Sequence, residues 1–194
     1  MGSALPLVLA SRSPQRRAIL EQVGVEVEVL PADVEELADG DPRTVAARNA
    51  RRKAHAVAAR IGGERVVVGC DTLVALDGRI YGKPADEAGA GAALAALSGR
   101  VHEVVSGLCV LEGGAERAAL AVTRVRFRRL EERLVRWYLA TGEWRERAGG
   151  YAVQGRGAVL VAGIEGDYLN VVGLPLATLL ELLPELLERL PGAG

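Results

Sequence analysis

Residues 65–71 read Arg-Val-Val-Val-Gly-Cys-Asp, an apolar, Val-rich run that ends in a carboxylate. A continuous apolar run without polar alternation is typical of a strand buried on both faces. Open α/β sheets place their ligand crevice at the carboxyl ends of such strands. We therefore expect a central strand over 65–70 that delivers Asp71 to a functional site. The alternative for Asp71 is a turn or capping residue beside Thr72.

The flanking segments predict a helix before this run and a hairpin after it. Apolar residues recur at helical spacing over residues 46–61, with Lys53 at the edge of the apolar stripe. Residues 73–80 hold Asp77-Gly78 between two short apolar runs, which is the pattern of a tight hairpin.

Helices and strands alternate along the rest of the chain. We expect strands over residues 5–10, 25–30, 101–111, 116–127 and 152–164, the last broken by Gly155 and Gly157. We expect helices over residues 14–23, 86–97 and 130–139, and an amphipathic helix or pair of helices over residues 170–190. Such alternation is typical of an α/β fold with a mixed sheet. Because 194 residues fit a domain of ordinary size, we expect one domain over residues 1–194.

The composition argues against several classes of partner. The 24 basic and 25 acidic residues give a net charge of −1 and are interspersed, so no basic block suits a nucleic-acid polymer. The most apolar stretch, residues 170–190, is interrupted by Pro and Glu, so we expect no membrane span. Two cysteines and an amino terminus without a signal-peptide pattern favour a reducing, cytoplasmic location.

Only Lys53 and Lys83 are lysines among the 24 basic residues. Lys brings a compact charge where Arg brings a wide planar fork, and this difference matters where phosphate oxygens are met in a tight space. Lys83 lies in the turn Gly82-Lys83-Pro84, which lacks the spacing of a phosphate-binding GxxxxGK[ST] loop. The alternative is that both lysines are compositional leftovers.

Residues 11–17 read Ser-Arg-Ser-Pro-Gln-Arg-Arg at a predicted strand-to-helix junction. Free backbone N–H groups and the helix dipole favour an anion at such a junction. Ser11, Arg12, Ser13 and Arg16 add donors that suit phosphate oxygens. The alternative is a well-capped helix with solvated arginines.

Carboxylates at Glu35, Glu36 and Asp71 offer hard oxygen ligands for a divalent cation such as magnesium. The alternative for the two glutamates is a solvated loop. Gln154, among glycines, offers a donor and an acceptor for the edge of a base, although such a residue is commonly part of a plain loop.

Eight segments span nearly the whole chain in one order. They are LASRSPQRR (9–17), DVEE (33–36), ARRKA (50–54), VVGCDTLV (67–74), GKP (82–84), LSGRVHEVVSG (97–107), AGGYAVQGRG (148–157) and YLNVVGLPL (168–176). Together they resemble the Maf family of nucleoside triphosphate pyrophosphatases. The resemblance implies an elongated, two-lobed α/β fold with a mixed, curved sheet and a central cleft, similar to the inosine triphosphate pyrophosphatases. It also implies cleavage between the α and β phosphates of a nucleoside triphosphate with Mg²⁺ or Mn²⁺.

The family's functional positions carry over residue by residue. They fall on Ser11, Arg16, Glu36, Lys53, Asp71, Lys83 and Gln154. The resemblance implies that Asp71 is the proton acceptor, that Lys53, Lys83 and Glu36 assist it, and that Glu36 and Asp71 hold the metal. Whether Asp71 acts as base, metal ligand or both stays open. The expected substrate-binding residues are Ser11, Arg12, Ser13, Gln15, Arg16, Thr72 and Gln154.

The base preference rests on three of these positions. Thr72 after the Asp and Gln154 in the later segment resemble the branch that acts on dTTP and UTP. The branch associated with 7-methyl-GTP has Gln and Glu at those places and Trp at the position of Gln15, which matches neither branch. We expect a pyrimidine substrate, with a purine such as 7-methyl-GTP as the alternative.

Two other functions remain open. The first is a nucleotide-binding regulator of cell division, a role also attached to the family, in which hydrolysis is incidental. The second is binding of some other phosphorylated metabolite at residues 11–17, which leaves Asp71, Lys83 and Gln154 unexplained. The sequence also leaves open whether the protein forms a homodimer.

Overall fold

A computed structural model describes residues 6–62 and 65–190. The strands are β1 (Leu7–Leu9), β2 (Val27–Val29), β3 (Val67–Leu76), β4 (Arg79–Tyr81), β5 (Val101–Glu112), β6 (Ala115–Phe127) and β7 (Val161–Glu165). The α-helices are α1 (Pro14–Gln22), α2 (Pro42–Ile61), α3 (Glu87–Leu97), α4 (Glu132–Ala140), α5 (Tyr168–Val172) and α6 (Leu176–Leu182). Short 3-10 helices are η1 (Ala148–Gly150), η2 (Gly155–Leu160) and η3 (Pro184–Arg189). Residue 5, the first of the expected amino-terminal strand, lies outside the described residues.

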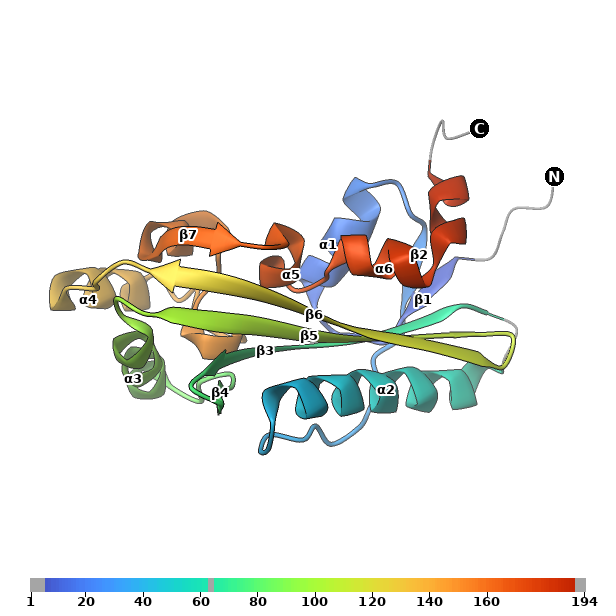
Figure 1. Ribbon diagram of the computed structural model, residues 1–194, viewed down its shortest axis with the longest axis horizontal. Helices are drawn as coiled ribbons and strands as arrows, with labels where there is room; N and C mark the ends of the chain where they lie inside the picture. The colour runs from blue at the N-terminus through green and yellow to red at the C-terminus, as the bar shows by residue number, and fades with distance from the viewer. Residues whose placement is uncertain (1–5, 63–64, 191–194) are drawn as a thin grey trace.

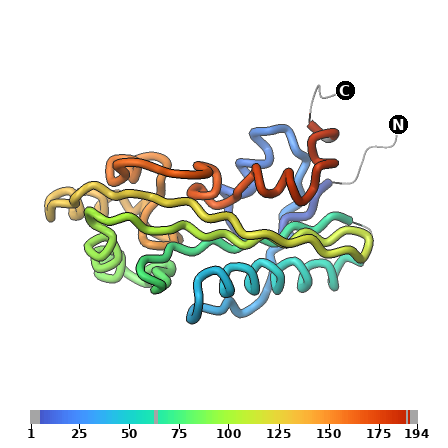
Figure 2. Tube along the Cα trace, in the orientation of Figure 1, coloured from blue at the N-terminus to red at the C-terminus, as the bar shows by residue number. Residues whose placement is uncertain are grey.

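The strands form one mixed sheet in the order β2-β1-β3-β5-β6-β7, with β4 beside β3. β1 is parallel to β2 and β3, whereas β3, β5, β6 and β7 are successively antiparallel. α2 lies on one side of the long strands, and α1, α5 and α6 lie on the other (Figure 1). The β5–β6 hairpin runs along most of the elongated molecule (Figure 2). The α/β class and the mixed sheet predicted from the sequence are confirmed.

The predicted end of the central strand at residue 70 is wrong. β3 continues through Asp71 to Leu76. Antiparallel pairing with β5 from Val67 to Ala75 sustains the strand past the carboxylate. The predicted hairpin follows, with the turn at Asp77-Gly78. Asp71 and Thr72 are therefore neighbours within a strand, and their side chains point to opposite faces of the sheet.

Two glycines bring α2 unusually close to the sheet. A Cβ atom at Gly69 would lie 2.2 Å from the carbonyl oxygen of Ala50, and one at Gly107 would lie 2.3 Å from that of Ala46. Glycine in a strand interior marks such close backbone approach. Gly107 is the cross-strand partner of Asp71, so α2 approaches the sheet next to this carboxylate.

Apolar clusters on both faces of the sheet are interrupted at the same level of β3. On the α2 face, Val67 belongs to one cluster and Leu73 to another, with Gly69 and Asp71 between them. On the opposite face, Cys70 belongs to a cluster with α1 and α6, and Val74 belongs to one with α3 and α4, with Thr72 between them. The polar residues thus separate two ends of an elongated core.

The last quarter of the chain departs from the prediction in one place. Residues 152–164 were expected to form strands, but residues 155–160 form a 3-10 helix and only Val161–Glu165 pairs in the sheet. Gly155 has a φ of +66°, which an extended strand does not use. The amphipathic segment after residue 170 is helical, and no helix in the described part of the chain is long and apolar enough to cross a membrane.

Candidate active site

The site lies where one edge of β3 loses its strand partners. β1 pairs with Val67 and Val68, and β4 pairs with β3 only from Val74 onward. Within the described ranges, no strand pairs with this edge in between. Asp71 and Thr72 occupy this gap, just past the end of β1 and close to the start of α1.

Asp71 is buried on the α2 face and is held by two residues of that helix. Its Oδ1 accepts a hydrogen bond from Lys53 Nζ at 2.6 Å, and its Oδ2 accepts one from Asn49 Nδ2 at 3.0 Å. Lys53 Nζ also lies 2.8 Å from Glu36 Oε1, which comes from the loop before α2. We call Asn49, Lys53, Asp71 and Glu36 the Asp71 cluster.

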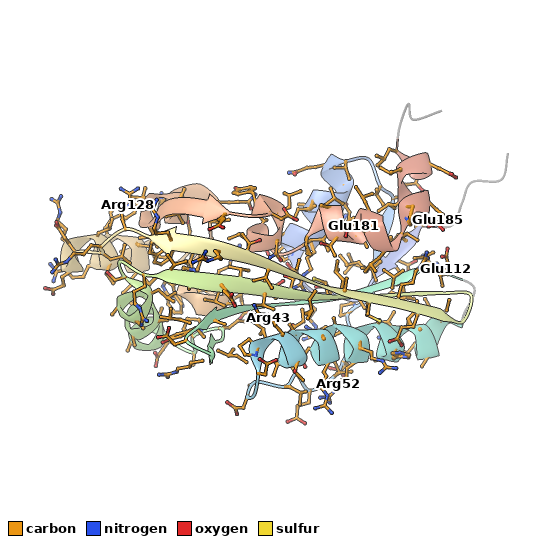
Figure 3. The ribbon with its side chains drawn as sticks, in the orientation of Figure 1. Arg43, Arg52, Glu112, Arg128, Glu181 and Glu185 are labelled. Carbon is orange, nitrogen blue, oxygen red and sulfur yellow. The ribbon has the colours of Figure 1, made fainter. Side chains whose placement is uncertain are left out.

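The sequence of α2 explains why Lys53 reaches Asp71. Asn49 and Lys53 are four residues apart, so they lie on one face of the helix, the face that Gly69 and Gly107 draw onto the sheet. The Lys53 side chain is only 9% exposed, although the sequence placed it at the edge of the apolar stripe. Its neighbour Arg52 projects from α2 to solvent (Figure 3).

The charges of the Asp71 cluster do not cancel. Two carboxylates share one ammonium group, and the Asp71 side chain is 5% exposed whereas that of Glu36 is 52% exposed. A buried carboxylate needs a paired cation and hydrogen bonds, which Lys53 and Asn49 supply. The remaining negative charge faces the more open side, where a cation is favoured.

A second polar cluster lies on the opposite face of β3 and is built around the buried guanidinium of Arg16. Arg16 donates from Nη1 to Ser11 Oγ at 2.9 Å, from Nη2 to Thr72 Oγ1 at 3.0 Å, and from Nε to the Gly173 carbonyl at 2.8 Å. Thr72 Oγ1 also lies 2.8 Å from Ser106 Oγ. We call these five residues the Arg16 cluster.

All hydrogen-bond acceptors of Arg16 in the described structure are neutral. A guanidinium remains charged at any relevant pH and favours an anionic partner. The Arg16 cluster therefore leaves a positive charge that a ligand phosphate or an electron-rich carbonyl can meet.

The start of α1 is capped as the sequence predicted. Ser13 Oγ accepts from the backbone N–H of Arg16 and donates to Gln15 Oε1 at 3.1 Å, and Pro14 occupies the first turn. Arg12 is exposed, and its guanidinium lies 3.6 Å from the Asp33 carboxylate. Capping and exposed cations thus occur together at this junction.

Lys83 and Gln154 have no described contact with a residue of the Asp71 cluster or of the Arg16 cluster. Lys83 is exposed, and its Nζ lies 3.1 Å from Glu146 Oε2. Gln154 is exposed too, just before a 3-10 helix in which the Gly157 N–H donates to Glu143. The described contacts bring neither residue to Asp71 or Arg16.

A divalent cation fits the donor chemistry of the Asp71 cluster. Glu36 and Asp71 bring hard oxygen atoms to one point, the Lys53 ammonium. No group of three or more His, Cys, Asp or Glu side chains with metal-site geometry occurs among the residues the structure describes. Magnesium is commonly bound by one or two carboxylates together with waters and substrate phosphates, so Glu36 and Asp71 are the described residues that would hold it.

Burial sets the protonation of two other groups near the sheet. Burial raises the pKa of the Cys70 thiol, so that it stays protonated on the Arg16 face. Burial also lowers the pKa of His102 to about 4, and its Nε2 lies 2.8 Å from the Tyr151 hydroxyl. His102 thus holds the loop before Gln154 as a neutral side chain.

Sequence reasoning missed Asn49, Ser106 and the Gly173 carbonyl as site components. Asn49 had a usable signal, because it stands four residues before Lys53 on a stripe of buried residues. Ser106 also had one, as a lone hydroxyl in a continuous apolar strand. The Gly173 carbonyl had none, because backbone groups carry no sequence pattern.

The fold and the site define a class of protein. It is an α/β protein in which a carboxylate–lysine cluster and a buried arginine cluster flank a stretch of β3 that, among the described residues, is paired with a strand on one edge alone, that of β5. The chain belongs to the Maf-like protein family, which matches residues 6–186.

Two relatives share most of their length with this chain. A protein of Thermococcus gammatolerans named dTTP/UTP pyrophosphatase is 46% identical over 91% of this chain and 94% of its own. A protein of the same name from Thermococcus onnurineus is 48% identical over 88% and 92%. Among solved structures, the Ham1 protein of Staphylococcus aureus aligns over 63% of this chain and 72% of its own, with a TM-score of 0.46 and 17% identity.

Proposed function

We propose that this protein is a nucleoside triphosphate pyrophosphatase, a hydrolase that uses water to cleave the bond between the α and β phosphates. The products are a nucleoside monophosphate and diphosphate. The observation that carries this proposal is the Asp71 cluster, which sets a buried, oriented carboxylate beside a lysine. The names of relatives more than 40% identical over most of their length support the same activity.

Phosphoryl transfer requires positioning and neutralisation of spread negative charge more than covalent chemistry. Lys53 and Arg16 supply buried cations on the two faces of β3. Arg12 and Lys83 are exposed cations that can meet the phosphates from outside. Ser11 and Ser13 add neutral donors at the start of α1.

Asp71 is the residue we assign to the attacking water. Its carboxylate is fixed at both oxygens, so it can orient or deprotonate a water in one direction. The same carboxylate, together with Glu36, would hold Mg²⁺ or Mn²⁺. When bound, such a cation would neutralise negative charge on the phosphates and lower the pKa of a water bound to it.

We further propose that the base is a pyrimidine, as in dTTP and UTP. Thr72 belongs to the Arg16 cluster, whose donors and hydroxyls suit the carbonyl oxygens of such a base. Gln154, in the loop before η2, would form hydrogen bonds with the edge of the base. Gln15, whose side chain accepts a hydrogen bond from Ser13 Oγ, is the expected substrate-binding residue that matches neither branch of the family.

The test is a panel of nucleoside triphosphates with Mg²⁺ or Mn²⁺, with products separated by chromatography. We expect diphosphate and the monophosphate, fastest from dTTP and UTP. A preference for a purine such as 7-methyl-GTP would overturn only the base assignment. If the protein binds nucleotides but hydrolyses none of them, the assignment as an enzyme is overturned and a regulatory role is favoured.

A further inference from the structure

Asn49 is a buried polar residue in the middle of α2 that is not among the residues assigned above to substrate, metal or water. Its side chain is 1% exposed and lies between the apolar residues Val45, Ala46 and Ala50. Asn is a weak helix former, and burying its amide without hydrogen bonds is costly. Its place in this stripe therefore calls for specific partners.

The amide of Asn49 finds partners from two parts of the chain. Its Oδ1 accepts the backbone N–H of Leu37 at 2.8 Å, and its Nδ2 donates to the Leu37 carbonyl at 2.9 Å. Nδ2 also donates to Asp71 Oδ2 at 3.0 Å. Because Leu37 offers one donor and one acceptor, the amide has a single orientation, which turns its second N–H toward Asp71.

These bonds connect Asp71 to the loop that carries Glu36. Leu37 directly follows Glu36 in a segment without regular secondary structure, residues 30–40. Fixing the backbone of Leu37 fixes where the Glu36 side chain begins, and Glu36 then reaches Lys53. One amide thus places both carboxylates of the cluster relative to each other.

We propose that Asn49 is a positioning residue for the hydrolysis, holding Asp71 Oδ2 while it anchors the loop of Glu36. This inference rests on the proposed function. With Lys53 on Oδ1 and Asn49 on Oδ2, rotation of the Asp71 carboxyl plane would break at least one of these hydrogen bonds. A carboxylate that orients water needs such a fixed direction, because small misplacements of a reacting group are costly.

The competing possibility is that Asn49 only anchors the loop. In that case a substitution of Asn49 displaces the loop of Glu36 and weakens the binding of substrate or metal. Saturating concentrations of triphosphate and metal then restore kcat to the wild-type value. Loss of the Asp71 orientation acts on the chemical step, so kcat stays low at saturation. The two roles therefore separate in a comparison of kcat with KM.

The experiment uses Asn49→Ala, the uncharged and nearly isosteric Asn49→Leu, and Arg48→Ala as a matched control. Arg48 is the exposed neighbour of Asn49 on α2 and lies outside both clusters. Each full-length variant is checked for folding by circular dichroism and thermal melting. Diphosphate release is then measured at saturating triphosphate and metal. If Asn49→Ala does not fold, Asn49→Leu, which nearly keeps the volume and adds no charge beside Asp71, decides the question.

We expect both Asn49 variants to lose at least about tenfold in kcat at saturation, with Arg48→Ala unchanged. A folded Asn49 variant with kcat within about twofold of wild type overturns the positioning role, even if KM rises or the melting temperature falls. Absence of diphosphate release by the wild-type protein would instead overturn the proposed function.

Discussion

Lys53 meets two carboxylates from a position with almost no solvent exposure. Its ammonium lies 2.6 Å from Asp71 and 2.8 Å from Glu36, so one compact charge serves both. A planar guanidinium needs more room and binds a carboxylate best side by side. The geometry of Lys53 therefore explains why a lysine stands here in a chain whose other basic residues are nearly all arginine.

We expect Lys53→Arg to lower diphosphate release by at least about tenfold, despite the preserved charge. Steady-state kinetics with dTTP and UTP checks this expectation. Lys83→Arg should also impair the enzyme, but less, because the Lys83 side chain is 60% exposed and has room for the larger group. Wild-type rates in both variants would mean that the shape of these cations does not matter.

At the level of single residues, the sequence singled out Asp71 and Lys53 but not Asn49, which contacts Asp71. Asp71 and Lys53 stood out because a carboxylate after an apolar run and a rare lysine are unusual. Asn49 was not among the predicted site residues, and its contact with the Leu37 backbone could not be read from the sequence. Contacts that backbone groups make with residues distant in the chain leave no recognisable pattern in the amino-acid sequence.

α2 and β3 together form the element that creates the Asp71 cluster. Gly69 and Gly107 let the helix backbone approach the sheet at Ala50 and Ala46, one turn of helix apart. This approach sets the distance from Lys53 to Asp71. A strand glycine in an otherwise apolar run is a signal of close packing, but the sequence does not say which helix packs there.

We expect Gly69→Ala and Gly107→Ala each to destabilise the protein by about 3 kcal/mol or more, because the new methyl group would overlap a carbonyl oxygen. Chemical denaturation measures this change. Gly91→Ala in α3 is the control: its Cβ would meet Leu139 at 3.5 Å, an ordinary contact, and alanine favours helix. Equal stability of all three variants would contradict the close approach of α2.

His102 in β5 makes the free energy of unfolding depend on pH. Burial lowers the folded-state pKa to about 4 from the model-peptide value of 6.5. The unfolded chain therefore takes up a proton as pH falls below about 6.5, while the folded chain does so only near 4. The free energy of unfolding then falls across this window by up to about 3 kcal/mol and changes no further below it.

His102→Asn removes this titration while leaving a polar group toward Tyr151. We expect the melting temperature of wild type to fall more steeply than that of the variant between about pH 6.5 and pH 4. Scanning calorimetry across this range checks the difference. Parallel pH profiles would show that His102 is not held neutral in the folded protein.

The boundary of β3 shows why element ends were harder to predict than elements. The sequence suggested a strand that ends at Cys70, because the continuous apolar run stops there and Asp71 follows. Pairing with β5 through Ala75 overrides this local preference. As a result, Asp71 and Thr72 face opposite sides of the sheet.

On the scale of the whole molecule, the polar residues of β3 lie between two sets of apolar clusters on both faces. The α/β class and the mixed sheet were predictable from alternating helix and strand patterns. The division of the site between two faces was not, because it depends on the register of β3 against its neighbours. The central cleft implied by the family resemblance stays a prediction.

Removal of divalent cations should separate activity from folding. The apolar clusters hold the fold, and Lys53 already compensates Asp71, so we expect a chelator to leave the melting temperature unchanged. Diphosphate release should stop and return with Mg²⁺ or Mn²⁺. A large drop in melting temperature on chelation would show instead that a metal supports the structure.

Diphosphate release by wild type and by Asp71→Asn, with dTTP and Mg²⁺, tests the role of the Asp71 cluster most directly. The substitution keeps the size of the side chain and removes its negative charge. We predict rapid release by wild type and a loss of at least about a hundredfold in the folded variant. Full turnover by Asp71→Asn would contradict the assignment of this carboxylate to the reaction.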